Sequence, residues 1–150
     1  MNIDDYDRKI LHELEHDGRL SNVELADRIG LSPSGCLRRV GELEKSGVIQ
    51  GYRAVLNRKL LSQGLAVYTA VGLSDHSRDT LEAFEAAIAN YPEVIECHCV
   101  TGAIEYLLRI QVADLEQYKA FHTNVLGSTP GVSRITSQVV MSSPKDGRAL

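Results

Sequence analysis

The residues best suited to bind another molecule stand together in the first third of the chain. Ser32, Ser34 and Gly35 are small or polar, so the backbone around them can come close to a phosphate group. Arg38 and Arg39 follow closely, and a guanidinium can donate two hydrogen bonds to a phosphate or to guanine O6 and N7. This combination predicts contact with nucleic acid.

Two short helices joined by a tight turn are expected to hold these residues, over the stretch Ser21–Leu43. Ser21 followed three residues later by Glu24 is a capping box, which satisfies free backbone amides at a helix start. Ser32 can cap the second helix, and Pro33 suits its first position. Two helices with a small, polar and basic outer face are typical of helix-turn-helix DNA-binding domains.

An apolar stripe at helical spacing predicts the buried face of each helix, including a bracing first helix over Asp4–Asp17. The expected inward residues are Tyr6, Ile10, Leu11 and Leu14 in the first helix, Val23, Leu25, Ala26 and Ile29 in the second, and Cys36, Leu37, Val40 and Leu43 in the third. The third helix would then turn Ser34, Gly35, Arg38, Arg39 and Glu42 outward.

The formal net charge of −4 alone argues against nucleic acid, but the charge is unevenly distributed. Residues 1–33 hold four basic and eight acidic side chains, residues 34–59 six basic and two acidic, and residues 61–150 six basic and ten acidic. The positive window coincides with the third helix, and phosphate binding needs only a local patch. The structural alternative is a solvated helix face on which Arg38 pairs with Glu42.

Beyond the third helix, the pattern of Val48–Leu56 predicts a short strand or hairpin, which in this position would be a wing. Arg53 within it could meet the DNA backbone. Arg19 and Asn22 could also touch phosphates, or could equally be ordinary surface residues. Asn57–Gly64 is polar and is the best candidate for a hinge between domains of residues 1–60 and 61–150.

The second domain is expected to repeat a strand–helix–strand unit. The elements are strands Leu65–Leu73, Pro92–Val100, Ile104–Val112 and Pro130–Met141, helices starting at Asp79 and Asp114, and a loose tail over Ser142–Leu150. This duplication predicts a ferredoxin-like βαββαβ fold, so the whole chain is classed as α+β. One sheet face, carrying Leu107, Arg109, Gln111 and Thr136, would be bare, and a second subunit is expected to cover it.

The cysteines invite a metal hypothesis, which the spacing does not favour. Three cysteines without a Cys-x-x-Cys pair predict no disulfide framework. Along a strand, Cys97 and Cys99 would share a face that His98 does not, and no further zinc ligand is suitably spaced. We therefore interpret both as core cysteines and expect no metal and no cofactor.

Other classes of protein find little support in the sequence. No nucleophile–base pair, phosphate loop or carboxylate pair indicates an enzyme. No apolar run reaches the roughly 18 residues of a membrane helix. The acidic N-terminus lacks a signal-peptide pattern, which favours a cytoplasmic protein. A sensing or assembly protein with a vestigial helix-turn-helix is the remaining alternative, and the positive window argues against it.

A series of motifs runs through nearly the whole chain. They are Asp5–Leu11, Asp17–Arg19, Ser21–Ala26, Gly30–Ser34, Cys36–Val40, Leu43–Tyr52, Glu96–His98, Thr101–Gly102, Glu105–Arg109, Val112–Asp114 and Pro130–Val132. This series resembles the Lrp/AsnC (leucine-responsive/asparagine-responsive, feast/famine) family of transcriptional regulators. The resemblance implies an N-terminal winged helix-turn-helix domain and a C-terminal ACT-like (RAM) sensing domain.

The resemblance also implies partners. These are a double-stranded DNA operator, a second copy of the chain, and a small amino acid as effector. Dimers of such regulators often assemble into octamers, and the protein would be nucleoid-associated and control genes of amino-acid metabolism.

Pattern and resemblance together define two candidate sites. The DNA-binding residues are Ser21, Asn22, Ser32, Pro33, Ser34, Gly35, Arg38, Arg39 and Arg53. The effector residues are Val100, Thr101, Gly102, Ala103, Ile104, Glu105 and Tyr106, in the turn after the second strand, with Thr136. Gly102 would admit a carboxylate to backbone N–H groups, and Glu105 would pair with an α-amino group. Ala103 stands where relatives usually carry an acidic or polar residue, which leaves the effector open.

Overall fold

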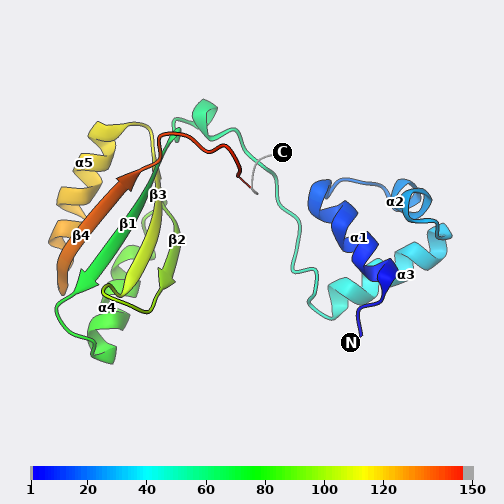
Figure 1. Cartoon of the computed structure of the whole chain (residues 1–150), viewed down its shortest axis with the longest axis horizontal. Coiled ribbons are helices and arrows are strands. Elements are labelled where there is room, and N and C mark those ends of the chain that lie inside the picture. The colour runs from blue at the N-terminus through cyan, green and yellow to red at the C-terminus, as the bar shows by residue number, and fades with distance from the viewer. Residues whose placement is uncertain (1, 147–150) are drawn as a thin grey trace. The chain divides into compact units, whose positions relative to one another are not determined.

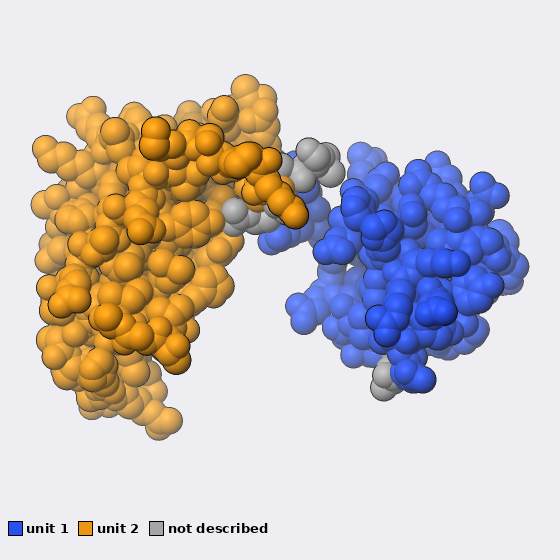
Figure 2. All heavy atoms as spheres, viewed as in Figure 1, with its two compact units in different colours: residues 1–55, 147–150 blue, residues 56–146 orange. Residues whose placement is uncertain are grey.

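The computed structural model describes residues 2–146, which divide between Val55 and Leu56 into an N-terminal and a C-terminal unit (Figures 1 and 2). The division precedes the expected boundary after residue 60. Asn57 caps a 3-10 helix, η1 (Arg58–Leu61), in which Arg58 also donates to Gln63 of the C-terminal unit. The predicted tail is irregular at residues 142–146, and its last four residues lie outside the described residues.

The N-terminal unit consists of α1 (Asp5–His16), α2 (Asn22–Ile29) and α3 (Pro33–Lys45). Asp4, Ser21 and Ser32 cap these helices, and each accepts a hydrogen bond from the backbone N–H three residues later. Gly30, with a φ of 73°, ends α2 in the left-handed conformation. The buried core is aliphatic and consists of Ile10, Leu25, Ala26, Ile29, Cys36 and Leu43.

Three of the residues predicted to face this core lie at the surface. Val23 is 64% exposed, Leu37 62% and Tyr6 41%. Each apolar stripe is therefore narrower than predicted, because only the side of a helix that packs against the rest of the unit is enclosed. Leu37 joins the outer face of α3, while Cys36 and Leu43 take the inward positions.

The strand or hairpin predicted over Val48–Leu56 does not form. All of these residues are described, and none of them is paired as a strand. The segment is held against α3 instead: the Ile49 N–H donates to the Leu43 carbonyl oxygen (3.1 Å), and the Tyr52 hydroxyl donates to Glu44 (2.9 Å).

The C-terminal unit is a four-stranded antiparallel sheet with two helices on one face (Figure 1). Its elements are β1 (Leu65–Leu73), α4 (Arg78–Ile88), β2 (Val94–Cys99), β3 (Tyr106–Val112), α5 (Leu115–Asn124), the 3-10 helix η2 (Leu126–Ser128) and β4 (Val132–Val139). The strand order is β2-β3-β1-β4. The predicted βαββαβ fold is confirmed.

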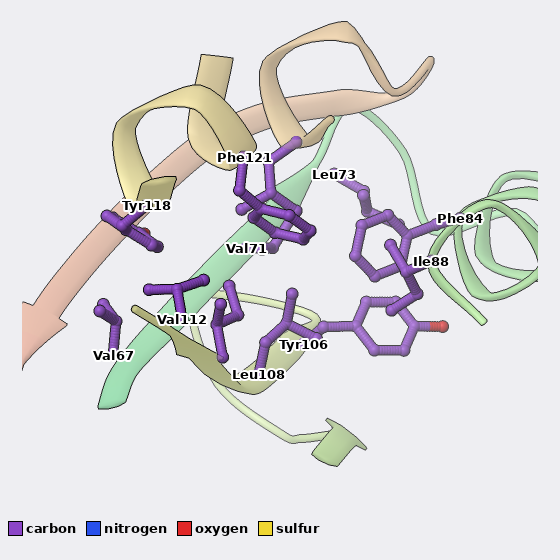
Figure 3. Packing of buried hydrophobic residues seen from close by; sticks show 12 residues of the cluster. Val67, Val71, Leu73, Phe84, Ile88, Tyr106, Leu108, Val112, Tyr118 and Phe121 are labelled. Atoms are coloured by element: carbon purple, nitrogen blue, oxygen red, sulfur yellow. The ribbon is translucent and has the colours of Figure 1, made fainter. Parts of the chain in front are cut away.

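The core of this unit lies between the sheet and its two helices (Figure 3). Alternate residues of the central strands β1 and β3 meet Phe84 and Ile88 of α4 and Tyr118 and Phe121 of α5. The buried Thr69 hydroxyl is hydrogen-bonded to the Tyr118 hydroxyl (2.9 Å), so the one polar side chain of this strand face is satisfied.

The other face of the sheet carries Leu107, Arg109, Gln111 and Thr136, as predicted. It is not bare throughout. Gln111 is 6% exposed and its Nε2 donates to the Gln63 carbonyl oxygen (2.9 Å), so the chain itself shields one end of the face. Within residues 2–146, no helix is long and apolar enough to cross a membrane.

Candidate nucleic-acid interface and effector turn

One side chain joins the starts of α2 and α3. The Asn22 side-chain amide donates to the Pro33 carbonyl oxygen at 2.7 Å. Ser21 and Glu24 form a reciprocal capping box, and the Ser21 hydroxyl (2.6 Å) and backbone N–H hold the pKa of the Glu24 carboxyl below its ordinary value. Asn22 therefore brings two helix N-termini, with their free N–H groups, close together.

The start of α3 is compact and polar. Ser32 Oγ accepts from the Gly35 N–H (3.2 Å) and lies 3.4 Å from Ser34 Oγ. A Cβ at residue 35 would lie only 3.0 Å from Ser32 Oγ, so glycine leaves room for this cap. Both serines are exposed, but the Ser32 hydroxyl caps the helix, whereas the Ser34 hydroxyl accepts no backbone hydrogen bond among the described residues.

The exposed face of α3 follows helical spacing and includes two residues that were not predicted to lie there, Leu37 and Gly41. Ser34, Leu37, Arg38, Gly41 and Glu42 lie on it. Arg38 donates to Glu42 at 2.6 Å, with side-chain exposures of 63% and 54%. Such an exposed pair contributes at most about 1 kcal/mol, so Arg38 can exchange Glu42 for another acceptor. The spacing of Leu37 from Ser34 was the signal that could have revealed the position of Leu37.

Arg39 lies away from this face, contrary to the outward position predicted for it. Its Nη1 is 2.8 Å from carboxylate oxygens of both Asp7 and Asp4, and its guanidinium lies over the Tyr6 ring at 5.5 Å. Its side chain is 22% exposed. The carboxylates of Asp7 and Asp4 raise the pKa of Arg39. Arg39 therefore ties α3 to the start of α1.

Arg53 lies in the extended segment after α3 and is exposed. No ion pair engages it within the described part of the chain, so its charge is available to an outside partner. Lys45, in the last turn of α3, is exposed as well.

Backbone hydrogen bonds hold the effector turn in place. The Val100 N–H donates to the Glu105 carbonyl oxygen (2.9 Å), and the Glu105 N–H donates to Val71 (3.1 Å). Gly102 has a φ of 125°, and a Cβ there would meet nothing within 4 Å. Among residues 2–146, the N–H groups of residues 101–103 have no hydrogen-bond acceptor. The turn thus offers free amides of the kind that bind a carboxylate.

The side chain of Glu105 is occupied. Its Oε2 accepts from the Leu73 N–H at 2.5 Å, its Oε1 lies 3.0 Å from His76 Nδ1, and the side chain is 11% exposed. The carboxylate that was expected to meet a ligand's α-amino group thus holds the end of β1 to the turn.

Tyr106 and Thr136 lie on opposite faces of the sheet, so the structure does not bring them together. Tyr106 is 1% exposed and packs against Phe84 with ring centroids 4.7 Å apart (Figure 3). Its hydroxyl donates to Glu85 at 2.6 Å. Burial, reinforced by Glu85, raises the pKa of Tyr106 far above its ordinary value. Thr136 is exposed opposite Ala70.

Cys97 and Cys99 are exposed, so the prediction that they are core residues was wrong. They pair with Leu108 and Tyr106 and share the face of β2 opposite His98, as expected from strand periodicity. β2 is partly buried over residues 94–96 and exposed over its last three residues. In the described chain, no three His, Cys, Asp or Glu side chains form a metal-ligand group.

Both units match models of known protein families. A family model described as "Winged helix-turn-helix DNA-binding" matches residues 3–50, and one described as "Lrp/AsnC ligand binding domain" matches residues 66–150. The leucine-responsive regulatory protein of Escherichia coli (strain K12) is 43% identical over 148 residues, covering 99% of this chain and 90% of that protein.

Solved structures of other regulators are similar to this chain over nearly its whole length. A Neisseria meningitidis transcriptional regulator in complex with L-Met has a TM-score of 0.93 and 36% identity, covering 99% of this chain and 96% of that one. An AsnC family transcriptional regulator from Agrobacterium tumefaciens has a TM-score of 0.89 and 31% identity, covering 95% and 93%. These relatives are transcriptional regulators and not enzymes. The chain belongs to the Lrp/AsnC family of transcriptional regulators, with an N-terminal winged helix-turn-helix DNA-binding domain and a C-terminal ligand-binding domain.

Proposed function

We propose that this regulator binds its operator by placing α3 in the major groove of double-stranded DNA. The observation that carries the proposal is the exposed face of α3, whose Arg38 is held only by an exposed ion pair. The joined starts of α2 and α3, formed by Ser21 and Asn22 and by Ser32, Pro33 and Gly35, place the positive ends of two helix dipoles together, which favours phosphates there. Arg53 adds a contact to the DNA backbone, and Arg39 acts indirectly by orienting α3.

Arg38→Ala tests this proposal against a matched control. Arg78 pairs with Glu82 at i,i+4 on the exposed surface of α4, in the same arrangement as Arg38 with Glu42. DNA sites are first selected from a random pool with the wild-type protein. At fixed salt, Arg38→Ala should lose about 1–3 kcal/mol of discrimination between the selected site and an altered one, because a bidentate guanine contact contributes that much. Arg78→Ala should discriminate as the wild type does, and equal discrimination between the two sites by all three proteins would refute the assignment.

We propose further that an amino acid is the effector and that its carboxylate binds the free amides of residues 101–103. Two findings support this: the availability of those amides and the similarity to a regulator solved with L-Met. Since Glu105 already holds Leu73 and His76, the α-amino group would be met by a neighbouring subunit.

A thermal-shift screen of the twenty amino acids tests the effector proposal, because a ligand that binds the folded state raises the unfolding midpoint. Glu105→Gln keeps an oxygen for the Leu73 N–H and removes the charge. It should therefore retain the shift that the wild type shows. Loss of the shift in Glu105→Gln would place that carboxylate in the binding site, and no shift with any amino acid would refute the proposal.

Oligomerisation is proposed to proceed through the sheet face that carries Arg109, Gln111 and Thr136, first to a homodimer and then to an octamer. Support comes from polar atoms on that face: among the described residues, Arg109 Nε and Gln111 Oε1 are buried without a hydrogen-bond partner. Two copies would also present two recognition helices to paired half-sites. Such an assembly would act on the nucleoid, in the cytoplasm.

Sedimentation of the full chain tests this arrangement. The wild type should sediment as an even-numbered oligomer. Thr136→Arg should shift it toward the monomer, since a charge would be buried at the interface. A monomeric wild type would contradict the proposal.

A further inference from the structure

Cys97 and Cys99 line a cavity that neither candidate site uses. The cavity, of ≈ 300 Å³, lies between the edge strand β2 and α4. Its lining includes both thiols, Glu85 and Tyr106, and contains no lysine, arginine or histidine. A pocket with two sulfur ligands and a nearby carboxylate favours a cation over an anion.

The spacing of the two thiols excludes a disulfide between them. Residues two apart on a strand are separated by about 6.6 Å, and their Cβ atoms point the same way. A disulfide needs its Cβ atoms about 3.5–4.5 Å apart. Both cysteines are free in this structure. The pair is therefore better suited to holding something between its sulfur atoms than to bonding with itself.

A single metal ion fits that gap. One metal–thiolate bond is about 2.3 Å long, so two in line span about 4.6 Å. Sulfur atoms that lean toward each other from Cβ atoms about 6.6 Å apart can meet this distance. Four-coordinate zinc needs further ligands, and residues 2–146 bring no third His, Cys, Asp or Glu into such a group.

The Cys97 thiol is poorly suited to redox sensing. The Cys97 thiol is partly enclosed by the cavity walls, and this desolvation, with Glu85 and Cys99 nearby, raises the pKa of Cys97. A thiol with a raised pKa is a poor nucleophile for oxidants. A soft cation with high affinity for thiolate can still displace the protons.

We propose that Cys97 and Cys99 form a two-coordinate site for a soft monovalent cation, copper(I) being the biologically available ion of this class. Two S–H bonds break, two Cu–S bonds form, and two protons pass to solvent, without change of oxidation state. An ion bound here would fix the end of β2, directly before Val100 and the effector turn.

Copper(I) transfer from a chromophoric chelator tests the site in the fully reduced, full-length protein under argon. Bathocuproine disulfonate serves as competitor, and native mass spectrometry gives the stoichiometry. The wild type should retain one ion per chain, whereas Cys97→Ser and Cys99→Ser should each lose it. His98→Ala is the matched control, since His98 lies between the two cysteines but on the opposite face, and it should bind as the wild type does.

Three results would overturn the proposal. The first is copper retained by the variant in which both cysteines are serine. The second is copper lost in His98→Ala as fully as in either cysteine variant. The third is withdrawal of zinc from a competing chelator with the same dependence on Cys97 and Cys99, since that would require a site of higher coordination number.

Discussion

The two candidate sites present different kinds of group to their partners: side chains on α3 and backbone N–H groups at the effector turn. On α3, the exposed groups are the side chains of Ser34, Leu37 and Arg38. At the effector turn, the polar side chain of Glu105 is used within the fold, and the free groups are backbone N–H donors. The first site therefore depends on the identity of side chains, and the second on the conformation of the backbone. Substitutions should affect the two sites by different physical routes.

Among these substitutions, the largest change in the free energy of unfolding is expected for Gly102→Ala. An alanine there meets no steric clash but must adopt a φ of 125°, which costs about 1–3 kcal/mol in the free energy of unfolding. Gly41→Ala is the matched control, because Gly41 lies in the middle of α3, also with open space around it. That substitution should stabilise the N-terminal unit by about 0.5–1 kcal/mol. Chemical denaturation measures both, and equal effects would show that conformation does not distinguish the two positions.

A smaller difference in stability is expected between alanine substitutions at two serines of the DNA-binding face, Ser32 and Ser34. Ser32→Ala removes the cap of α3 and should cost about 0.5–2 kcal/mol of stability. Ser34→Ala removes an exposed hydroxyl and should change stability by less than about 0.5 kcal/mol. Thermal unfolding of the two variants side by side tests the distinction. A more destabilising Ser34→Ala would reverse the roles that we assign.

Acid should weaken the N-terminal unit through Asp4. The Asp7 backbone N–H, with further help from Arg39, holds the pKa of Asp4 below its ordinary value of 3.8. Folding therefore favours the ionised form, so the stabilisation is present above that ordinary value and is lost as the pH falls through the lower folded value. Asp4→Asn can still cap α1 but cannot titrate. Its thermal midpoint should fall less between pH 5 and pH 3 than that of the wild type, and identical curves would contradict the assignment.

Much of the fold follows from residue patterns. Ser21 with Glu24, Ser32 with Pro33, and the alternating residues of β1 each specify local structure through hydrogen bonding or periodicity, and all three predictions are confirmed. Periodicity could not show which part of an apolar stripe its neighbours enclose. Leu37 and Cys97 were therefore predicted to be buried, although both are exposed.

The candidate sites were less predictable than the fold, because long-range partners decide which groups stay free. Arg38 and Arg39 are adjacent and chemically identical, yet only Arg39 meets carboxylates from α1. In the same way, Glu105 is bound by Leu73 and His76, residues that lie some thirty positions earlier in the chain. Predicting such contacts would have required the packing of α1 on α3 and of β1 beside the turn.

Amide hydrogen exchange in the full-length chain tests the contrast between the two sites most directly. Selected operator DNA should slow exchange at the start of α3, at residues 34–37, and leave the effector turn unchanged. The amino acid found by the thermal-shift screen should slow exchange at residues 101–103, whose N–H groups have no acceptor among the described residues and should exchange quickly without ligand. Unchanged exchange at residues 101–103 on saturation with that amino acid would contradict recognition by the backbone of this turn.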